Sequence, residues 1–429
     1  MKRILLSILS IIGILFILDY LIYRGVFLLG EGQWLYIIDF LLKSIFIFLL
    51  IINVLYKRAF TLNSNKTIIT IFIILPLILS MLIADRLVAL NKFYYYSKTL
   101  NKSFSGLIWQ YDDSLSYKGL PYSQGSYNYY LGDTIEGRVP LIFDSLGFRT
   151  VPDSLRINSD STDLYLGCSY TFGDFVEAQN TYSYLTSKFL NHNYINAAIV
   201  GYGAGQMVQI AEKLLPKRKF SYVFIQLSSW IVPRAMEING PTRFGYRPFP
   251  YYSETGSSFK LNLPAYKTRM YSIKNWRKTQ RSYFEKMFFS FTDGYKIEIH
   301  DYYSFKFAEL KIRLGILPKP TQNKTALEIV YYDHLIDLCL RHMAVPVVLK
   351  LMYPDKDCET LVRHIRKKAK IIDLDSVLQT IVSRTGIKYG KLFKIHHVQN
   401  NDSINFDSHP NKFAHSIFSE TIYNALKRE

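Results

Sequence analysis

The sequence contains little cysteine, with Cys168, Cys339 and Cys358 as the three such residues among 429. An odd number argues against a disulfide framework, and the spacing fits no zinc pattern. We therefore expect no metal and no cofactor.

Acidic residues are also scarce, 34 Asp and Glu against 52 Lys and Arg, which leaves a net charge of +18. This excess favours anionic surroundings such as a phospholipid surface or acidic glycans, and because no nucleic-acid motif accompanies it we expect no nucleic-acid partner.

Charged residues are few in three stretches near the N-terminus, residues 4–22, 34–56 and 67–90. Each stretch is about as long as a helix that crosses a bilayer. No small-residue cleavage site follows the first stretch, which argues against a signal peptide that is removed. The sequence therefore predicts a membrane anchor of three transmembrane helices over residues 1–90.

Basic residues beside these stretches indicate the orientation of the anchor. Lys2 and Arg3 precede the first stretch, and Lys57, Arg58 and Lys66 separate the second from the third. The positive-inside rule places both basic segments in the cytoplasm. After three crossings, the rest of the chain is expected outside the cytoplasmic membrane, in the periplasm or at the cell surface.

Beyond residue 160 the pattern changes to short apolar strands that alternate with helices. This alternation predicts an α/β fold in which a parallel sheet is covered by helices on both faces. Residues 231–325 interrupt it as a proline-containing, irregular insertion. Residues 91–160, rich in Tyr, Gly and Ser, show little periodicity and are interpreted as an extension that lies over the domain at 161–429. The expected strands are 164–166, 194–200, 222–227, 345–351 and 371–374, and the expected helices are 180–190, 206–216, 326–342, 358–369, 375–384 and 411–427.

The first of these strands ends in a turn that carries a serine. Gly167 follows the strand, Ser169 lies in the turn and Gly173 closes the loop. A serine at the mouth of a parallel strand can point its hydroxyl into a cleft that the backbone N–H groups of the turn also face. That placement suits a nucleophile and its oxyanion hole. A strand followed by an ordinary polar turn gives the same local pattern, so this stretch alone does not decide the function.

Asp407 and His409 lie together near the C-terminus, before a helix that Pro410 could start. Serine catalysis needs a base within hydrogen-bond reach of the hydroxyl, and a carboxylate that fixes the tautomer of the imidazole. An Asp and a His two residues apart in one loop can both face the cleft. Because such pairs are common, this one is weak support by itself. His415, on the following helix, is interpreted as a structural residue.

Four segments together resemble the SGNH (GDSL-type) hydrolase superfamily. The resemblance implies a three-layer α/β/α flavodoxin-like domain and ester chemistry through Ser169, His409 and Asp407. It further implies that the backbone amides of Ser169 and Gly203 donate to the oxyanion. Residues 167–173 resemble the first motif of the family, 196–206 the second and 407–411 the last, and 144–149 resemble a segment that precedes the first strand in many bacterial members.

The chain departs from this family at two places. Cys168 replaces the usual aspartate between the glycine and the serine, which matters little because that aspartate is not catalytic. The third motif, Gly-x-Asn-Asp, is replaced by residues 228–231, so the asparagine that donates to the oxyanion is absent. Loss of one such donor typically costs ~10²–10³ in rate. The hydroxyl of Ser228 or Ser229, or the Trp230 N–H, could substitute, and Ser229 is the residue we expect in this role.

The sequence thus predicts a membrane-anchored SGNH-type serine esterase or O-acyltransferase that acts on an extracytoplasmic acylated glycan or lipid-linked substrate. Hydrolysis and transfer use the same residues, and transfer would need an acyl donor handed over by a separate membrane protein. The alternative is a catalytically weak or inactive SGNH-fold module that binds glycan or protein in an envelope assembly. The absent asparagine and the insertion favour the alternative, whereas the presence of Ser169, His409 and Asp407 favours the enzyme.

Overall fold

The computed structural model describes residues 100–429 except 132–133, 243–244, 257, 268–294, 387–391, 393–395, 400–401, 406–408 and 429. All described residues belong to one compact unit, Leu100–Gln280 with Lys286–Glu429. The transmembrane helices expected at 4–22, 34–56 and 67–90 lie outside the described residues. Within the described part, no helix combines the length and apolar character that crossing a membrane requires.

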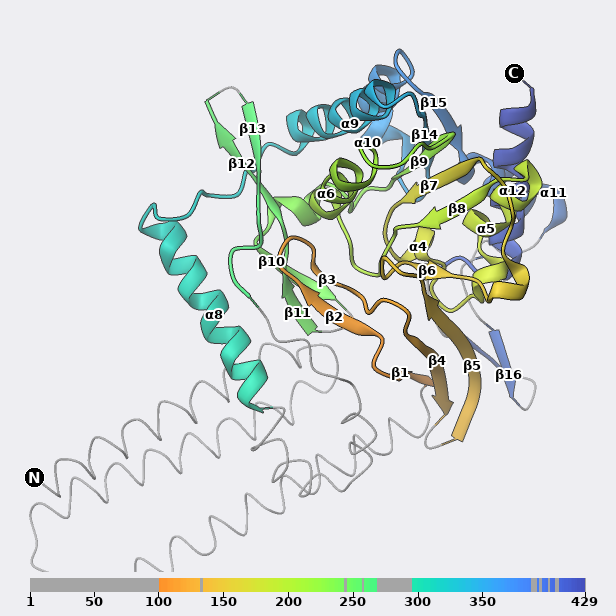
Figure 1. Cartoon of the computed structure of the whole chain (residues 1–429), viewed down its shortest axis with the longest axis horizontal. Helices are drawn as coiled ribbons and strands as arrows, with labels where there is room; N and C mark the ends of the chain where they lie inside the picture. Colours follow the sequence, from red (N-terminus) through yellow and green to blue (C-terminus); the bar gives the residue numbers. More distant parts are fainter. Residues whose placement is uncertain are drawn as a thin grey trace, which may run out of the picture. The chain divides into compact units, whose positions relative to one another are not determined.

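Five parallel strands form the centre of this described unit (Figure 1). Their spatial order is β8-β7-β9-β14-β15, and every neighbouring pair is parallel. Counted along the chain this order is 2-1-3-4-5, the arrangement of flavodoxin-like doubly wound sheets. The predicted α/β fold with a mostly parallel central sheet is confirmed. The strands are β7 (Thr162–Leu166), β8 (Asn193–Asn196), β9 (Tyr222–Leu227), β14 (Val345–Lys350) and β15 (Lys370–Asp373).

Helices pack on both faces of this parallel sheet, as Figure 1 shows. On one face, α9 (Lys324–Arg341) contacts both α6 (Ala204–Leu214) and α10 (Asp355–Ile365). On the other, α12 (Lys412–Lys427) contacts both α5 (Tyr182–Leu190) and α11 (Leu374–Thr385). Four of these helices begin at a polar residue whose side chain accepts a hydrogen bond from the first turn, as favoured N-caps do. These N-caps are Thr181, Asn323, Asp373 and Asn411.

Much of the described part of the extension predicted at 91–160 forms strands that continue the central sheet. Antiparallel strands in the order β1-β4-β5-β6 add to one side, and β6 pairs with β8. Tyrosine suits a strand but fits either face of it, so the alternation of apolar and polar residues is hidden in the sequence. The elements are β1 (Leu100–Ser105), β4 (Gln124–Leu131), β5 (Thr134–Phe143) and β6 (Arg149–Thr150), with the separate hairpin β2 (Trp109–Asp112) and β3 (Ser116–Gly119).

The insertion predicted at 231–325 is not irregular in its described part. It contains a short 3₁₀ helix, two hairpins and a long helix. Pro241 and Pro248 lie in a two-stranded hairpin, where a missing N–H donor is tolerated more easily than inside a large sheet. The elements are η3 (Pro233–Met236), β10 (Asn239–Thr242), β11 (Gly245–Pro248), β12 (Tyr251–Thr255), β13 (Ser258–Asn262) and α8 (Tyr295–Arg313); a further hairpin, β16 (His396–Gln399) and β17 (Asp402–Asn405), precedes α12.

Candidate active site

The order of the parallel strands reverses at β7, which has β8 on one side and β9 on the other. In open α/β sheets, ligands bind beyond the carboxyl ends of the strands at such a reversal. Ser169 lies at this place. It is the first residue of the one-turn helix α4 (Ser169–Phe172), which follows β7 directly after Gly167 and Cys168.

The turn that presents Ser169 is fixed by the Gln226 side chain of the neighbouring strand β9. Gln226 Oε1 accepts hydrogen bonds from the Cys168 backbone N–H at 3.0 Å and from Thr171 Oγ1 at 2.7 Å. These side chains also explain Gly167, because a Cβ there would lie 2.1 Å from Thr171 Oγ1 and 2.6 Å from Gln226 Oε1. The glycine of the first motif therefore leaves room for the side chains that shape the turn.

Arg149 holds the loop that follows α4. Its side chain is buried, and Nη1 donates to the carbonyl oxygens of Phe172 at 2.9 Å and Gly173 at 2.5 Å, while Nη2 donates to that of Val176. Gly173 has a φ of +74°, a conformation that favours glycine. Arg149 therefore stabilises the backbone behind Ser169, which is a structural role for the arginine of the segment at 144–149.

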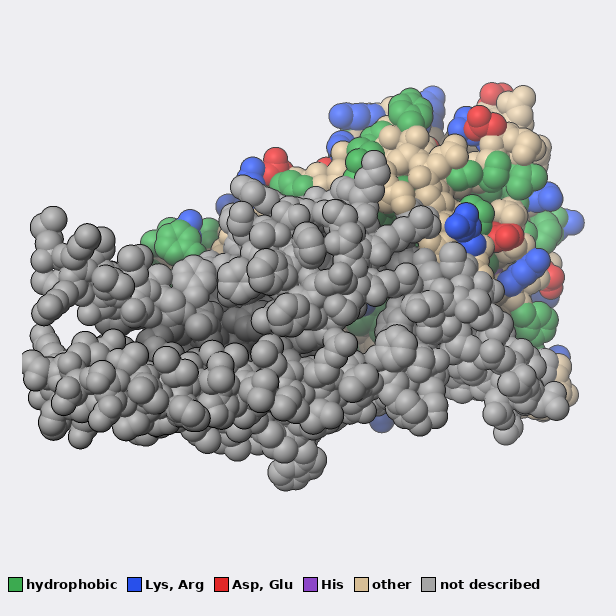
Figure 2. Space-filling model, turned by 90° about the horizontal axis from the view of Figure 1, so that it is seen from below, with side chains coloured by type: hydrophobic (Ala, Val, Ile, Leu, Met, Phe, Trp, Pro, Cys, Tyr) green, Lys and Arg blue, Asp and Glu red, His purple; other side chains and the backbone are tan. Residues whose placement is uncertain are grey.

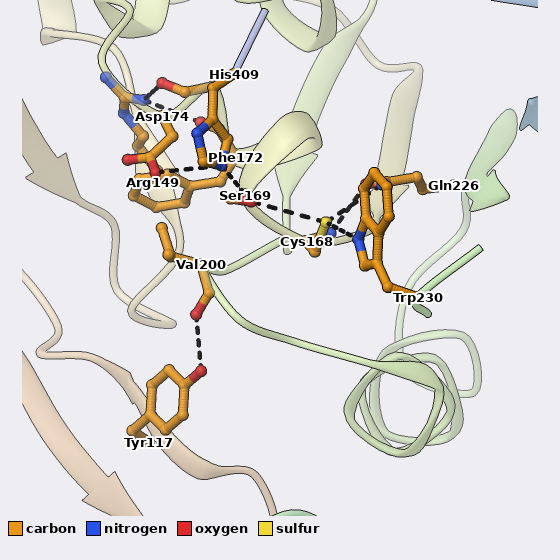
Figure 3. A network of polar contacts seen from close by, with 11 residues as sticks. Tyr117, Arg149, Cys168, Ser169, Phe172, Asp174, Val200, Gln226, Trp230 and His409 are labelled. Atoms are coloured by element: carbon orange, nitrogen blue, oxygen red, sulfur yellow. Dashed lines mark hydrogen bonds and ion pairs between the residues drawn. The ribbon is translucent and has the colours of Figure 1, made fainter. Parts of the chain in front are cut away.

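His409 brings its imidazole to Ser169 from a position 240 residues later in the chain, with Nε2 2.8 Å from Oγ (Figure 3). The helix that follows, α12, begins at Asn411, whose side chain accepts from the Ala414 N–H at 3.0 Å. The Tyr170 ring contacts the imidazole edge to face at 5.1 Å between centroids. The distance between Nε2 and Oγ is that of a hydrogen bond, so His409 can take the proton of the serine hydroxyl.

Asp407, the predicted partner of His409, lies outside the described residues, and its role stays a prediction. A different carboxylate is described close to the imidazole: Asp174 Oδ2 lies 3.6 Å from His409 Nε2, and the Asp174 side chain is fully buried. The sequence analysis did not identify this residue. The only sequence feature that could have done so is its position directly after Gly173 of the first motif.

The strand expected over 194–200 ends at Asn196. Asn196 Nδ2 donates to the Thr171 carbonyl at 2.9 Å and to Ser183 Oγ at 3.0 Å, so its side chain connects the second motif to α4 and α5. The chain then turns, with Gly201 at a φ of +86° and the Tyr202 N–H bonded to the carbonyl of Ile199 at 3.1 Å. The predicted strand is too long because residues 198–200 are apolar and buried although β8 ends at Asn196; the last bond to the sheet is from the Ala197 N–H to the Tyr165 carbonyl of β7, at 3.0 Å.

Gly203, a predicted oxyanion donor, is the N-cap of α6. Its backbone N–H donates to Gln206 Oε1 at 3.0 Å. This bond satisfies one of the N–H groups that a helix start leaves without a partner. For Gly203 to stabilise an oxyanion, the Gln206 side chain would have to release it. The assignment of this donor stays a prediction.

Two of the three candidate substitutes for the missing asparagine are bonded to other protein groups. The Ser228 hydroxyl accepts from Gln226 Nε2 at 2.8 Å and donates to the Leu351 carbonyl at 2.5 Å. The Trp230 Nε1–H donates to Cys168 Sγ at 3.3 Å (Figure 3). Ser229 lies between them and is half-buried. Its hydroxyl is therefore the candidate that we retain.

Cys168 is buried, as expected of a small apolar residue, but its sulfur also accepts hydrogen bonds. Gln226 Nε2 and Trp230 Nε1 approach Sγ to 3.2 and 3.3 Å, and Ser169 Oγ lies 3.9 Å away. The sulfur thus connects the nucleophile turn to the loop after β9. No group of three His, Cys, Asp or Glu side chains suited to a metal ion occurs within the described residues.

His415 packs inside the domain beneath the site. Its Nδ1 accepts from the Tyr182 backbone N–H at 3.1 Å, and its ring stacks on that of Tyr182 at 5.5 Å. Burial lowers the pKa of His415 to about 3, with smaller contributions from Arg149 and His409. The ring is therefore neutral near pH 7, as suits the structural role predicted for it.

Comparison with known proteins gives matches among solved structures only, since no family model and no curated protein matches the chain. A member of the lipolytic protein G-D-S-L family from Veillonella parvula is 9% identical, with a TM-score of 0.31, over 63% of this chain and 100% of that one. A salicylyl-acyltransferase from a tetracycline biosynthetic pathway is 10% identical, with a TM-score of 0.32, over 77% and 78%. A family two carbohydrate esterase from Cellvibrio japonicus is 10% identical, with a TM-score of 0.30, over 77% and 98%.

These three structures are described as a lipolytic G-D-S-L protein, an acyltransferase and a carbohydrate esterase. Because these TM-scores are low, the function proposed below rests on the residues of this chain.

Proposed function

We propose that this protein is a serine ester hydrolase or O-acyltransferase of the SGNH type. The observation that carries this proposal is the 2.8 Å separation between Ser169 Oγ and His409 Nε2 at the strand-order reversal. Ser169 Oγ attacks the carbonyl carbon of an ester while Nε2 takes its proton. The alcohol then leaves with that proton, and the acyl group bound to Ser169 passes to water or to a sugar hydroxyl.

Asp407 is proposed to hold the His409 ring in the tautomer that leaves Nε2 free to accept a proton. The Ser169 amide and the Ser229 hydroxyl are proposed to stabilise the oxyanion, and the Gly203 amide joins them if Gln206 releases it. A serine hydroxyl in place of an asparagine amide is a less rigid donor. We therefore expect a slower acylation step than in enzymes that have the asparagine, by up to ~10²–10³-fold.

The proposed location is the outer side of the cytoplasmic membrane, with the apolar stretches at 4–22, 34–56 and 67–90 as the anchor. The proposed substrate is an acylated glycan or a lipid-linked compound, because the net charge of +18 favours anionic surroundings. On the described surface visible in Figure 2, Lys and Arg side chains are interspersed with Asp and Glu, so the charge does not by itself indicate one binding face. For acyl transfer, a separate membrane protein would supply the donor.

A non-catalytic module that binds glycan or protein in an envelope assembly is the second candidate. It is favoured by the bond from Gly203 to Gln206 and by the commitment of the Ser228 hydroxyl and the Trp230 N–H to other groups. In that case the nucleophile and base would be present beside an oxyanion site with too few donors.

Labelling with a fluorophosphonate probe distinguishes the two candidates, because the probe reacts only with an activated serine. We expect the full-length protein to be labelled and the Ser169→Ala variant to remain unlabelled. Ser376→Ala, which removes an exposed serine on α11, is the matched control and should be labelled like the wild type. A folded wild-type protein that fails to react would favour the binding module.

A further inference from the structure

The buried carboxylate of Asp174 faces the nitrogen of His409 that also faces the nucleophile. Its Oδ2 lies 3.6 Å from Nε2, and Ser169 Oγ lies 2.8 Å from the same atom. Asp174 itself is 1% exposed. Figure 3 shows the imidazole with Asp174 and Ser169 as its two polar neighbours in the network drawn. A carboxylate on this side of the ring is distinct from the predicted role of Asp407, which concerns the other ring nitrogen.

The backbone holds Asp174 in this position. Its N–H donates to the Ser169 carbonyl at 3.0 Å, so the carboxylate and the nucleophile belong to one hydrogen-bonded turn. The residues on either side are fixed as well, since Arg149 donates to the carbonyls of Gly173 and Val176. Phe175 has a φ of +63°, which is uncommon for a residue with a Cβ and indicates a tightly determined loop.

The carboxylate interacts differently with the two protonation states of His409. In the neutral imidazole that accepts the serine proton, Nε2 carries a lone pair. A nearby carboxylate is not attracted to this lone pair. Once Nε2 has taken the proton, the ring is a cation, and a carboxylate within about 4 Å attracts it. Because Asp174 is buried, water screens this attraction poorly. The interaction is therefore stronger in the transition state, where the ring is becoming a cation, than in the resting enzyme.

We propose that Asp174 is a positioning residue of this site, a second carboxylate that stabilises protonated His409 from the Nε2 side. The inference rests on the proposed function. In the step concerned, the bond from Ser169 Oγ to the carbonyl carbon forms as its proton moves to Nε2. The same proton then moves to the leaving oxygen as the ester C–O bond breaks. Asp174 takes no proton in this step.

Other charged and titratable groups surround the His409 ring. Ser169 and Tyr170 approach from α4, with Cys168 just before it. Arg149 of β6 and His415 of α12 belong to the same region, because the charges of Arg149 and His409 both lower the pKa of His415. Replacement of Asp174 by asparagine leaves these groups in place and removes only the negative charge.

Titration of the histidines tests this proposal on the full-length protein with ¹⁵N-labelled histidine, with the His409 resonance assigned from His409→Gln. In Asp174→Asn we expect the protonated form of His409 to be less favoured than in wild type, because a close opposite charge has been removed. Asp333→Asn is the matched control. Asp333 contacts His364 at 2.9 Å, so this variant should change the NMR signals of His364 and leave those of His409 unchanged.

A second readout is the pH dependence of kcat/KM for an aryl acetate. The acid limb of the Asp174→Asn profile should move to lower pH, and the plateau should fall about tenfold as the base weakens. Asp174→Glu should restore part of the position of the acid limb and part of the plateau rate. An unchanged His409 titration in a folded Asp174→Asn protein would overturn the proposal. If wild type shows no labelling and no hydrolysis, the proposed function fails, whereas the titration still decides the role of Asp174.

Discussion

The Tyr117 hydroxyl donates a hydrogen bond to the carbonyl of Val200 at 2.7 Å, and the Tyr202 hydroxyl donates one to the carbonyl of Tyr117 at 2.5 Å. Both tyrosines are fully buried, and their ring centroids are 5.5 Å apart. The loop after β8, which carries Gly201 and Gly203, is therefore fixed by the hairpin of β2 and β3. Tyr117, far upstream of Ser169, thus helps to fix the loop that carries Gly203.

Tyr117→Phe tests this connection. The substitution keeps the ring but leaves the Val200 carbonyl without its hydroxyl donor, and a buried polar group without a partner costs about 1–3 kcal/mol. We expect the free energy of unfolding, measured by urea denaturation, to fall by that amount. Tyr122→Phe removes a hydroxyl from a residue that is 79% exposed and should change stability by less than about 0.5 kcal/mol. Equal effects of the two substitutions would contradict the prediction.

Arg149→Lys should loosen the loop behind Ser169. A lysine ammonium cannot reproduce the planar fork that donates to the carbonyls of Phe172, Gly173 and Val176. We expect a loss of at least about 2 kcal/mol in unfolding free energy, since hydrogen bonds to charged groups are strong and the carbonyls are buried. Fluorophosphonate labelling of Ser169 should slow as well.

The control for Arg149→Lys is Arg156→Lys. Arg156 forms an ion pair with Asp153 at 2.8 Å, but both side chains are largely exposed, and such pairs contribute little to stability. Unfolding and labelling of this variant should match the wild type. An Arg149→Lys protein as stable as the control would show that the three carbonyls do not depend on the guanidinium.

Ser229→Ala tests the substitute oxyanion donor. If the Ser229 hydroxyl stabilises the oxyanion, kcat for an aryl ester should fall by ~10²–10³-fold with little change in KM. Ser228→Ala should instead affect mainly stability, because the Ser228 hydroxyl bonds Gln226 and the Leu351 carbonyl. Ser229→Asn, which places a side-chain amide donor at this position, should keep or raise the rate. A Ser229→Ala enzyme with unchanged kcat would assign the donor elsewhere.

His415 makes stability depend on pH in a defined window. Its pKa is about 3 in the folded protein and about 6.5 when unperturbed, so the unfolded chain binds the proton more strongly. Below about pH 6.5 the stability therefore falls as pH falls, by up to about 1.4 kcal/mol per pH unit, until pH 3. Urea denaturation between pH 7 and 4 should show a shallower slope for His415→Gln than for wild type. Parallel slopes would mean that His415 is not buried in its neutral form.

The fold of the central domain could be predicted because its strands are short apolar runs separated by helices with clear apolar faces. Expected helices such as 326–342 and 411–427 match α9 and α12 to within a few residues. The sheet extension from β1 to β6 could not be predicted, since tyrosine and serine carry no clear preference for one face of a strand. The same limit applies to the hairpins of the insertion, where pairing depends on contacts distant in sequence.

The residues of the site also divide into those that the sequence could predict and those that it could not. Ser169 and His409 could be identified because each belongs to a short motif next to a predictable element, and the structure brings their side chains together. Asp174 could not, because a single acidic residue after a glycine predicts nothing until the loop is seen to turn back toward the imidazole. The bond from Gly203 to Gln206 depends on a side-chain orientation that no sequence pattern indicates.

The proton acceptor of the pair comes from the end of the chain and the nucleophile from its first half, which has a consequence during synthesis. A ribosome-bound chain that has already folded β7 and α4 still lacks the imidazole, and its serine is no more reactive than one in solvent. In the proposed mechanism, the hydroxyl gains its reactivity only when His409 comes within hydrogen-bond distance of it. A chain cut before His409 would then be an inert product rather than an unregulated one.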